Sequence, residues 1–394
     1  MGSNQQTPLS GIQVVEFSHM VMGPSIGLIL ADLGADVIKI EPISGDKTRN
    51  LIGSGAGYFA MYNRNKRSVC IDMKSEEGRD IVHRLVAKAD VVIENFRPGA
   101  LEKIGYGYAE LSKLNQALIY CSGRGFLKGP YEHRTALDEV AQMMGGLAYM
   151  TGPLGRPLRA GASVIDVMGG MFGVIGILSA LEMRHRTGVG QSISSSLFES
   201  TVFLVGQHMA QFAVTGVPAA PMPSRISAWA VYDVFSTAQD EKLFVGVVSD
   251  SQWKIFCQEF DLTQFKANPT LDTNAGRVEQ RDHIIPLVSA IFASLSMAEL
   301  TAKLEKSGLP YAPIIKPEQL LEDVHLNNSN GLLDVMLPNG QTASLPALPI
   351  SMSGQRLGLR LDVPKPGQHS REVLSQLGLD EGQITSLFER NISA

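Results

Sequence analysis

The first third of the chain alternates short apolar runs rich in β-branched residues with segments of helical spacing. The apolar runs cover residues 12–17, 36–40, 68–72, 90–93 and 117–121, and the helical patterns cover residues 25–33 and 76–88. Strands that alternate with amphipathic helices form parallel sheets with helices on their faces. The pattern therefore predicts an α/β domain with at least five strands.

Residues 167–181 form the longest apolar stretch and carry no charge between Asp166 and Glu182. A helix that crosses a bilayer needs roughly 20 apolar residues, so this stretch predicts a buried core helix instead. Residues 1–10 lack a basic region followed by an apolar one. We therefore expect no signal peptide and no membrane partner.

The composition changes after about residue 205, where prolines and glycine at residues 216–223 predict an extended connector. Two strand patterns joined by a polar turn follow, and then three helical patterns, which predict a smaller α+β unit. The expected organisation is a large domain over residues 1–205, a linker over 206–227, a small domain over 228–320, a return linker over 321–350 and a C-terminal segment over 351–394.

The length of 394 residues fits two domains at roughly 150 residues each. The 39 acidic and 34 basic side chains give a net charge of −5, which argues against nucleic acid as a partner. Three widely separated cysteines fit a reducing compartment, and we expect a cytoplasmic protein without disulfides or a metal site.

Asp166 is the first candidate for chemistry, and two interpretations of it are open. The first is a helix N-cap, a common role of aspartate. The second is a nucleophilic carboxylate, kept ionised by the helix N-terminus. Glycines 169, 170, 173 and 176 would then let a bulky substrate approach the backbone. The two interpretations are compatible.

Basic side chains gather near the ends of the predicted strands, at Arg64, Lys66, Arg67, Lys74, Arg97 and Lys103. They form either a solvated face or a site for a phosphorylated cofactor. Glu41 would suit a ribose-binding acid, but that fold needs a G-x-G-x-x-G turn. The loop at residues 18–24 holds a single glycine, so a nicotinamide cofactor is disfavoured.

An ordered set of motifs resembles the class III (family III) CoA-transferases. These are VEF at 15–17, GP at 23–24, LGADVIKIEP at 33–42, NKRS at 65–68, ID at 71–72, ENFRPG at 94–99, YG at 106–107, VAQ at 140–142, GIL at 176–178, TGVGQ at 187–191 and DVH at 323–325. The resemblance spans nearly the whole chain. It implies an interlocked homodimer whose subunits each have a Rossmann-like large domain, completed by the C-terminal segment, and a small α+β domain.

The resemblance also implies a reaction, because the family's catalytic carboxylate falls on Asp166. This side chain would accept the donor acyl group and then hold CoA as an aspartyl thioester, with acyl-CoA and a small carboxylic acid as substrates. Splitting the exchange in this way needs no metal, ATP or permanently bound cofactor. Oxyanion donors are expected near His19 and Met20.

Other site residues follow from the matched motifs or from residue type. The coenzyme-binding positions are His19, Met20, Ile71, Lys74, Asn95, Phe96 and Lys103, with Arg97 beside them. Arg134, Asp138 and Arg225, with His133 and Ser227 nearby, are candidates for binding the acceptor acid. Residues 65–67 either bind coenzyme phosphates or only cap the sheet.

Three departures from the family's patterns narrow the acceptor and the reaction. Val21 replaces a glutamine of the formyl-CoA:oxalate transferases, and residues 222–228 replace their glycine-rich lid. Both changes favour an acid larger than oxalate or formate. Leu137 stands where related α-methylacyl-CoA racemases place a catalytic histidine, which disfavours racemisation. A racemase or isomerase, and a CoA- or nucleotide-binding protein without catalysis, remain the alternatives.

Overall fold

The computed structural model describes residues 7–224 and 227–394, which divide into two compact units. The first unit holds the described residues up to Pro223 together with Val324–Ala394, and the second those within Ser224–Asp323. Both linkers that the sequence predicted contain helices or strands. Residues 206–215 belong to α8 (Leu197–Thr215), and residues 321–350 include α14 (Val324–Asn328) and the hairpin of β10 (Leu332–Met336) and β11 (Thr342–Pro346).

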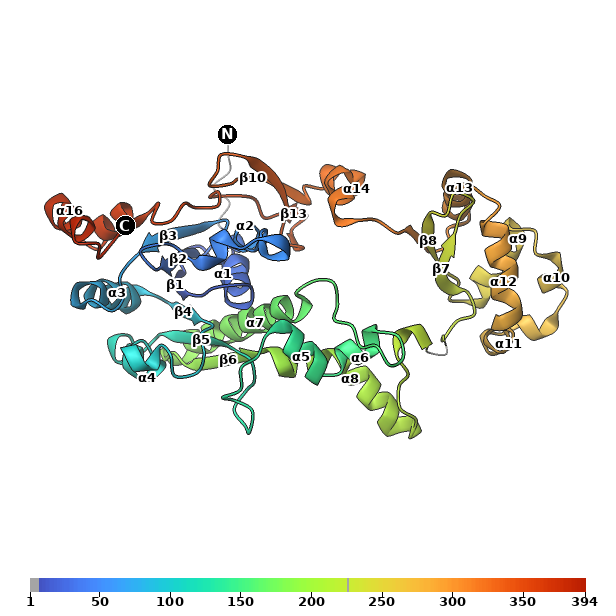
Figure 1. The fold of residues 1–394 in the computed structure, drawn as a ribbon, viewed down its shortest axis with the longest axis horizontal. Coiled ribbons are helices and arrows are strands. Elements are labelled where there is room, and N and C mark those ends of the chain that lie inside the picture. Colours follow the sequence, from blue (N-terminus) through green and yellow to red (C-terminus); the bar gives the residue numbers. More distant parts are fainter. Residues whose placement is uncertain (1–6, 225–226) are drawn as a thin grey trace. The chain divides into compact units, whose positions relative to one another are not determined.

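A six-stranded parallel sheet forms the centre of the first unit, in the order β3-β2-β1-β4-β5-β6 (Figure 1). The strands are β1 (Gln13–Phe17), β2 (Asp36–Glu41), β3 (Lys66–Cys70), β4 (Val91–Glu94), β5 (Ile119–Arg124) and β6 (Ser192–Ser196). The parallel α/β sheet is thereby confirmed. The sequence did not indicate β6, because its SISSS run consists of four serines and a single apolar residue.

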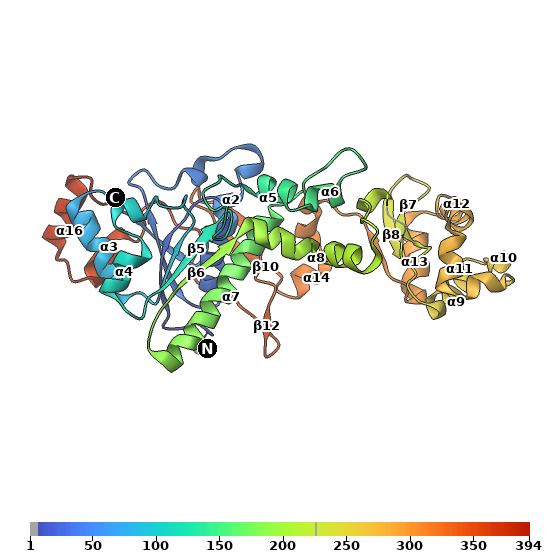
Figure 2. The same cartoon turned by 90° about the horizontal axis from the view of Figure 1, so that it is seen from below.

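Alternate residues of the strands face two separate cores, as the pleat of a strand requires. Val14, Val37 and Val91 face α1 (Met22–Asp32) and α7 (Val164–Thr187). Val15 and Ile38 face the other side, covered by α3 (Glu76–Lys88), α4 (Tyr108–Leu114), α15 (Ser370–Gln376) and α16 (Glu381–Glu389). Helices on both faces make this a doubly wound sheet (Figure 2).

The glycines of α7 bring this helix against α1. A Cβ atom at Gly169 would meet Met22, one at Gly170 would lie 2.0 Å from Ser25 Oγ, and one at Gly173 would meet Ile26. The contact positions advance together along both helices, so α1 and α7 run in the same direction. The expectation that these glycines admit a substrate is therefore wrong for these three, since their free faces are filled by α1.

Helix α7 is longer than the apolar stretch predicted, with 24 residues from Val164 to Thr187. Among the residues that the structure describes, it is the one continuous helix long and apolar enough to cross a membrane. Its glycine side packs on α1 and its residues Val174 and Ile177 belong to the core of the sheet. Met171 and Ile175, on another side, are exposed.

The packing of α1 on α7 gives a stability prediction. Gly170→Ala places a methyl group 2.0 Å from Ser25 Oγ and 3.2 Å from Met22 O, and should destabilise the fold by about 1–3 kcal/mol. Gly176→Ala is the matched control on the same helix, because its methyl group meets the movable end of Ile193 at 3.0 Å. Urea unfolding measures both. Equal stabilities would contradict the close approach of the two helices.

The C-terminal segment completes the first unit along β3. The N–H of His369 donates to Ser68 O, Cys70 N–H donates to Ser370 Oγ at 3.1 Å, and Ile71 pairs with Ser393. The segment begins with a two-strand ladder of β12 (Ser351–Met352) and β13 (Gln355–Arg356). The last residues of the chain thereby cover the edge of the parallel sheet.

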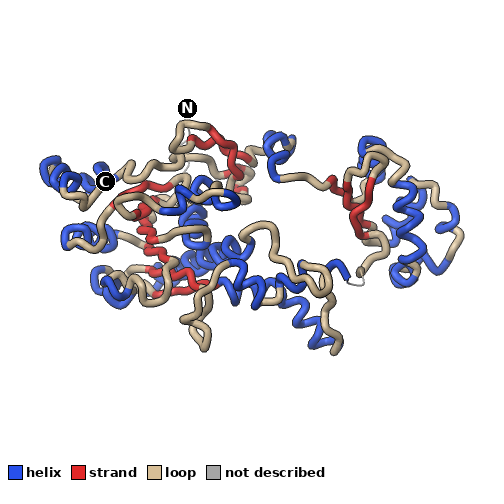
Figure 3. Tube along the Cα trace, in the orientation of Figure 1, coloured by secondary structure: helices blue, strands red, loops and turns tan. Residues whose placement is uncertain are grey.

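The second unit has its own core, and Figure 3 shows its mixture of strands and helices. An antiparallel sheet joins β7 (Tyr232–Ser236), β8 (Lys242–Gly246) and β9 (Tyr311–Pro313). Its helices are α9 (Asp250–Glu259), α10 (Thr263–Lys266), α11 (Asn274–Glu279), α12 (Arg281–Phe292) and α13 (Met297–Ser307). Leu243, Phe256 and Phe292 lie in the shared core.

Candidate active site

The order of the strands reverses between β1 and β4, and ligands of doubly wound sheets bind at the carboxyl ends of strands at such a point. The loops after these two strands contact each other. His19 N–H donates to Asn95 Oδ1 at 3.0 Å, and Asn95 Nδ2 donates to His19 O at 2.9 Å. The His19 and Phe96 rings lie 5.1 Å apart. The structure thus brings together four residues that were predicted to bind the coenzyme: His19, Met20, Asn95 and Phe96.

The backbone N–H groups of His19 and Met20 already have partners in the protein. His19 N–H donates to Asn95, and Met20 N–H donates to Thr48 Oγ1 at 3.1 Å. Neither group is free in this conformation to stabilise an oxyanion. Burial is the main cause that lowers the pKa of His19, so its imidazole is neutral near pH 7.

A pocket of about 360 Å³ lies at the carboxyl ends of β1 to β4. Three of the predicted coenzyme residues, Ile71, Lys74 and Phe96, line it together with Phe17, Ile40, Glu41, Pro42, Ile43, Asp72, Met73 and Ile104. Lys74 is exposed, and so are Arg97 and Lys103, which flank Phe96 and Ile104 in the chain. One exposed cation, Lys74, therefore lines a pocket with largely apolar walls, and two more follow or precede lining residues in the chain.

Asp166 lies in the first turn of α7, where the N-cap residue is Ser163. The N-cap interpretation of Asp166 is therefore wrong. The side chain that binds the N-terminus of α7 is Asp138, from α5 (Asp138–Met144): its Oδ1 accepts from the N–H groups of Ile165 at 2.9 Å and Asp166 at 3.1 Å. Because α7 runs parallel to α1, Asp166 lies toward the same edge of the sheet as the loop after β1.

Asp138 is buried, and both of its oxygens have partners. Oδ2 accepts from Gln142 Nε2 at 2.5 Å and lies 3.3 Å from Arg159 NH2. Gln142 Oε1 accepts in turn from Ala160 N–H at 2.8 Å. Arg159 also contacts Glu139. Asp138 therefore joins α5, α7 and the loop between them, and its carboxylate has no oxygen left over for a substrate.

Burial is the main cause that raises the pKa of Asp166, and the negative charges of Asp138 and Glu139 raise it further. Arg159 opposes these effects only in part, and the pKa of Asp166 is about 7. The expectation that the helix N-terminus keeps this group ionised is therefore too simple, because desolvation outweighs it. Near neutral pH the carboxyl group exchanges readily between its two protonation states.

Three residues around Asp166 were missed by the sequence analysis. Tyr58 and Tyr62 come from α2 (Tyr58–Tyr62), and the Tyr58 hydroxyl lies 3.5 Å from Ser163 Oγ. Burial and then the charge of Asp166 raise the pKa of Tyr62 to about 12, so this hydroxyl keeps its proton. Arg159 is the third. Nothing in the local sequence links the two tyrosines to Asp166, since more than 95 residues separate α2 from α7.

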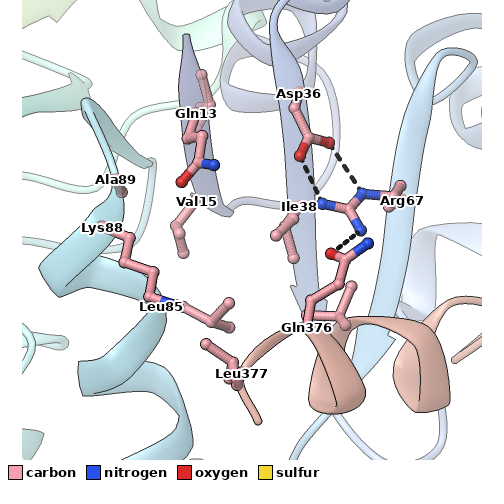
Figure 4. Close-up of a pocket in the computed structure, with 12 residues that line it drawn as sticks. Gln13, Val15, Asp36, Ile38, Arg67, Leu85, Lys88, Ala89, Gln376 and Leu377 are labelled. Atoms are coloured by element: carbon pink, nitrogen blue, oxygen red, sulfur yellow. Dashed lines mark hydrogen bonds and ion pairs between the residues drawn. The ribbon is translucent and has the colours of Figure 1, made fainter. Parts of the chain in front are cut away.

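The basic run before β3 does not form a phosphate site. Lys66 is fully buried, with its Nζ 2.8 Å from Glu16 Oε2, and Arg64 binds the buried Asp32. Asn65 also donates to Asp32. Figure 4 shows Arg67 bound to Asp36 and Gln376 in a small pocket lined by Gln13 and Asp36, the first residues of β1 and β2. That pocket lies at the amino ends of the strands, opposite the candidate site.

The remaining predicted residues have simpler surroundings. The exposed Arg134 guanidinium lies 5.0 Å from the centre of the Tyr131 ring. Glu41 binds Arg49 through both carboxylate oxygens, which leaves it unavailable to a ribose. Leu137 is exposed at the N-cap of α5. Arg225 lies outside the described residues. Within the part of the chain that the structure describes, no cluster of three metal-ligating side chains occurs.

The raised pKa of Asp166 gives a second prediction. A carboxyl group with an ordinary pKa of 3.8 in the unfolded chain and about 7 in the folded one favours folding when protonated. Its contribution is present below about pH 4 and is lost as the pH rises through 7. Asp166→Asn should therefore melt at a higher temperature than the wild type at pH 8, and at an equal temperature near pH 4. Glu182→Gln, an exposed change on the same helix, should show no such pH-dependent difference.

These features define a doubly wound α/β protein with a carboxylate and a pocket at the carboxyl edge of its sheet. The chain belongs to CoA-transferase family III, whose model matches residues 9–370. The predicted family and the predicted CoA-transferase class of enzyme are confirmed. CoA thioesters are substrates of this family.

Known relatives match the chain over most of its length. A succinate–glutarate CoA-transferase of Agrobacterium fabrum is 34% identical over 399 residues, 97% of this chain and 98% of the relative. An acetyl-CoA:oxalate CoA-transferase of Acetobacter aceti is 36% identical over 315 residues, 78% of this chain and 81% of the relative. The crystal structure of a CAIB/BAIF family protein from Brucella suis has a TM-score of 0.84 at 34% identity, covering 95% of this chain and 100% of that one.

Proposed function

We propose that this protein moves CoA from a donor resembling succinyl-CoA to a small dicarboxylic acid, with Asp166 as the nucleophile. The observation that carries the proposal is the position of Asp166, in the first turn of α7 at the sheet edge that holds the pocket, with a pKa of about 7. A nucleophile with a pKa near the working pH combines reactivity with sufficient ionisation. The relative named for succinate and glutarate supports the choice of acids.

The reaction proceeds through four acyl exchanges at three carbonyl carbons, those of the donor, of Asp166 and of the acceptor. An Asp166 oxygen attacks the thioester carbon, and the C–S bond breaks to give a mixed anhydride and CoA thiolate. The thiolate attacks the Asp166 carbonyl, releasing the donor acid as a carboxylate and leaving an aspartyl-CoA thioester. The acceptor carboxylate then attacks that carbonyl and expels the thiolate. Finally the thiolate attacks the acceptor's acyl carbon, which frees Asp166.

The coenzyme would occupy the pocket lined by Ile71, Lys74 and Phe96, with His19 and Met20 between it and Asp166. The exposed cations Lys74, Arg97 and Lys103 suit the phosphates of CoA. Tyr62 keeps its proton next to Asp166 and is our candidate donor to the oxyanions, in place of the two amides that already have partners.

For the acceptor we retain Arg134 and Arg225 as candidates for the distal carboxylate, because arginine binds carboxylates through two parallel hydrogen bonds. Asp138 receives a different role. Its oxygens hold the N-terminus of α7 and Arg159, so it positions Asp166 and sets its charge environment.

The test is a transfer assay read by mass spectrometry. The enzyme is incubated with succinyl-CoA and an equimolar panel of oxalate, malonate, glutarate, adipate and acetate, and the new thioesters are identified. We expect glutaryl- or adipoyl-CoA in excess over oxalyl-CoA. No new thioester from any acid would refute the proposal, and deuterium exchange at C2 of a 2-methylacyl-CoA without an acceptor would favour the racemase alternative.

We further propose that the functional unit is an interlocked homodimer. In the single chain, α7 and α8 leave large apolar side chains exposed, including Ile175, Phe203 and Phe212. Exposed apolar surface of this kind usually marks an association site. Light scattering should give twice the mass of the 42.6 kDa chain. The cytoplasmic location stays a prediction.

A further inference from the structure

Met20 has a strained backbone conformation at the candidate site. Its φ of 64° lies in the left-handed region, which is unfavourable for a residue other than glycine. Such a conformation persists only where the surroundings hold it. Ser18, His19 and Met20 each form one backbone hydrogen bond with a side chain outside the loop. The partners are Lys39, Asn95 and Thr48, respectively.

The first of these bonds comes from a lysine buried beneath the loop. Lys39 Nζ donates to Ser18 O at 2.6 Å, and lies 3.1 Å from Asp46 Oδ2 and 3.4 Å from Glu16 Oε1. Ser18 O and Glu16 Oε1 accept hydrogen bonds from this ammonium group, and Asp46 Oδ2 forms an ion pair with it. Burial opposes the charge on Lys39, but Glu16, Asp46 and Glu41 outweigh it and raise its pKa, so the group stays cationic.

The same lysine reaches Met20 by a second route. Asp46 is the N-cap of the short 3₁₀ helix Lys47–Asn50, where its Oδ1 accepts from Thr48 N–H at 2.9 Å. Thr48 is buried, and its Oγ1 accepts from Met20 N–H at 3.1 Å. Lys39 binds the other oxygen of Asp46. The Lys39 ammonium group therefore binds the Ser18 carbonyl directly and supports the Met20 N–H through Asp46 and Thr48.

We propose that Lys39 is the positioning residue of the coenzyme loop, acting on Ser18 directly and on Met20 through Asp46 and Thr48. The loop is thereby kept in the strained conformation in which His19 packs against Phe96. This inference rests on the proposed function, since it assigns the loop to CoA. Lys39 itself is fully buried and does not line the pocket, so its proposed effect on the coenzyme is indirect.

Thr48 offers the mildest test, because Thr48→Val removes one acceptor and keeps the shape of the side chain. We expect the Kd for CoA, measured by calorimetry, to rise about five- to tenfold, as for the loss of one hydrogen bond. KM for the acyl-CoA should rise in parallel while kcat changes less than about twofold. Thr48→Ser, which keeps Oγ, should restore both values.

Thr201→Val is the matched control, since it also removes a buried hydroxyl, one that donates to Leu197 O at 3.0 Å. It should lower the melting temperature to a similar extent without changing the Kd for CoA. Hydrogen exchange of the Met20 amide gives a readout without coenzyme: it should be faster in Thr48→Val and unchanged in Thr201→Val.

Lys39→Met tests whether the lysine itself positions the loop. It should weaken CoA binding more than Thr48→Val does, because it removes the support of both Ser18 and Asp46. Its control is Lys66→Met, which removes a buried cation from the same Glu16 but contacts Pro24 and Asn63 instead of residues 18–20. If Lys39→Met does not fold, the Thr48 series decides.

Two results separate the possible failures. If the wild type binds CoA and transfers it, and Thr48→Val frees the Met20 amide without weakening CoA binding, the positioning role is overturned and the proposed function stands. If the wild type binds no CoA, both fall. Unchanged exchange of the Met20 amide in Thr48→Val would also overturn the proposal.

Discussion

Asp166→Asn is expected to lower kcat for CoA transfer at least about 10⁴-fold, as the loss of a covalent nucleophile does in other enzymes. The asparagine keeps the size of the side chain, and the bond from residue 166 N–H to Asp138 is a backbone bond that the change does not remove. The folded structure should therefore survive. Transfer from succinyl-CoA to the best acceptor of the panel measures the loss.

Covalent trapping links that loss to the chemistry. Wild-type enzyme treated with acyl-CoA and then hydroxylamine should carry a hydroxamate on the peptide that contains Asp166, and Asp166→Asn should carry none. Glu182→Gln, on an exposed part of the same helix, is the control that should react like the wild type. Full turnover by the asparagine variant, or a hydroxamate on a different residue, would refute the assignment of the nucleophile.

The pH profile of kcat/KM should rise through an apparent pKa of about 7 on its acid side, because only ionised Asp166 attacks the thioester. Two substitutions should move this limb in opposite directions. Asp138→Asn removes the nearest negative charge and should lower the apparent pKa, whereas Arg159→Met removes a positive charge and should raise it. A shift of one unit changes the rate well below the midpoint by about tenfold.

The opposite signs make this experiment specific. A variant that only loosened the structure would lower the rate at every pH and leave the midpoint where it was. Melting curves at pH 7 establish that both variants are folded, since Asp138→Asn retains Oδ1 for the two amides but alters the contact with Gln142. A limb near pH 4 in the wild type, the ordinary range of an aspartate, would contradict the raised pKa of Asp166.

The strands that the sequence predicted are those whose residues carry a strong local signal. The strands β1, β2 and β4 are rich in valine and isoleucine, and β3 and β5 each hold two or three consecutive apolar residues, so the residue pattern alone was enough to predict them. The sixth strand lacks that signal. Its serines form a strand because they pair with the edge of β5, where Tyr120 lies opposite Ser192.

The sequence predicted the site residues that belong to family motifs. It did not predict those whose role depends on burial or on charges from distant parts of the chain. The family motifs pointed to Asp166, His19 and Asn95, which the structure places at one edge of the sheet. The sequence left the role of Lys66 and Arg67 open between a phosphate site and a structural one, because their distant partners, Glu16 and Asp36, cannot be inferred from the local sequence.

The sequence alone therefore determined the family, the parallel sheet and the identity of the candidate nucleophile, because periodicity and ordered motifs are local properties of the chain. Only the tertiary structure decided that Asp138 caps the nucleophile's helix, that the glycines of α7 receive α1, and that Asp166 titrates near pH 7. Those properties depend on burial and on charges brought close by folding from positions far apart in the chain, and no local pattern records them.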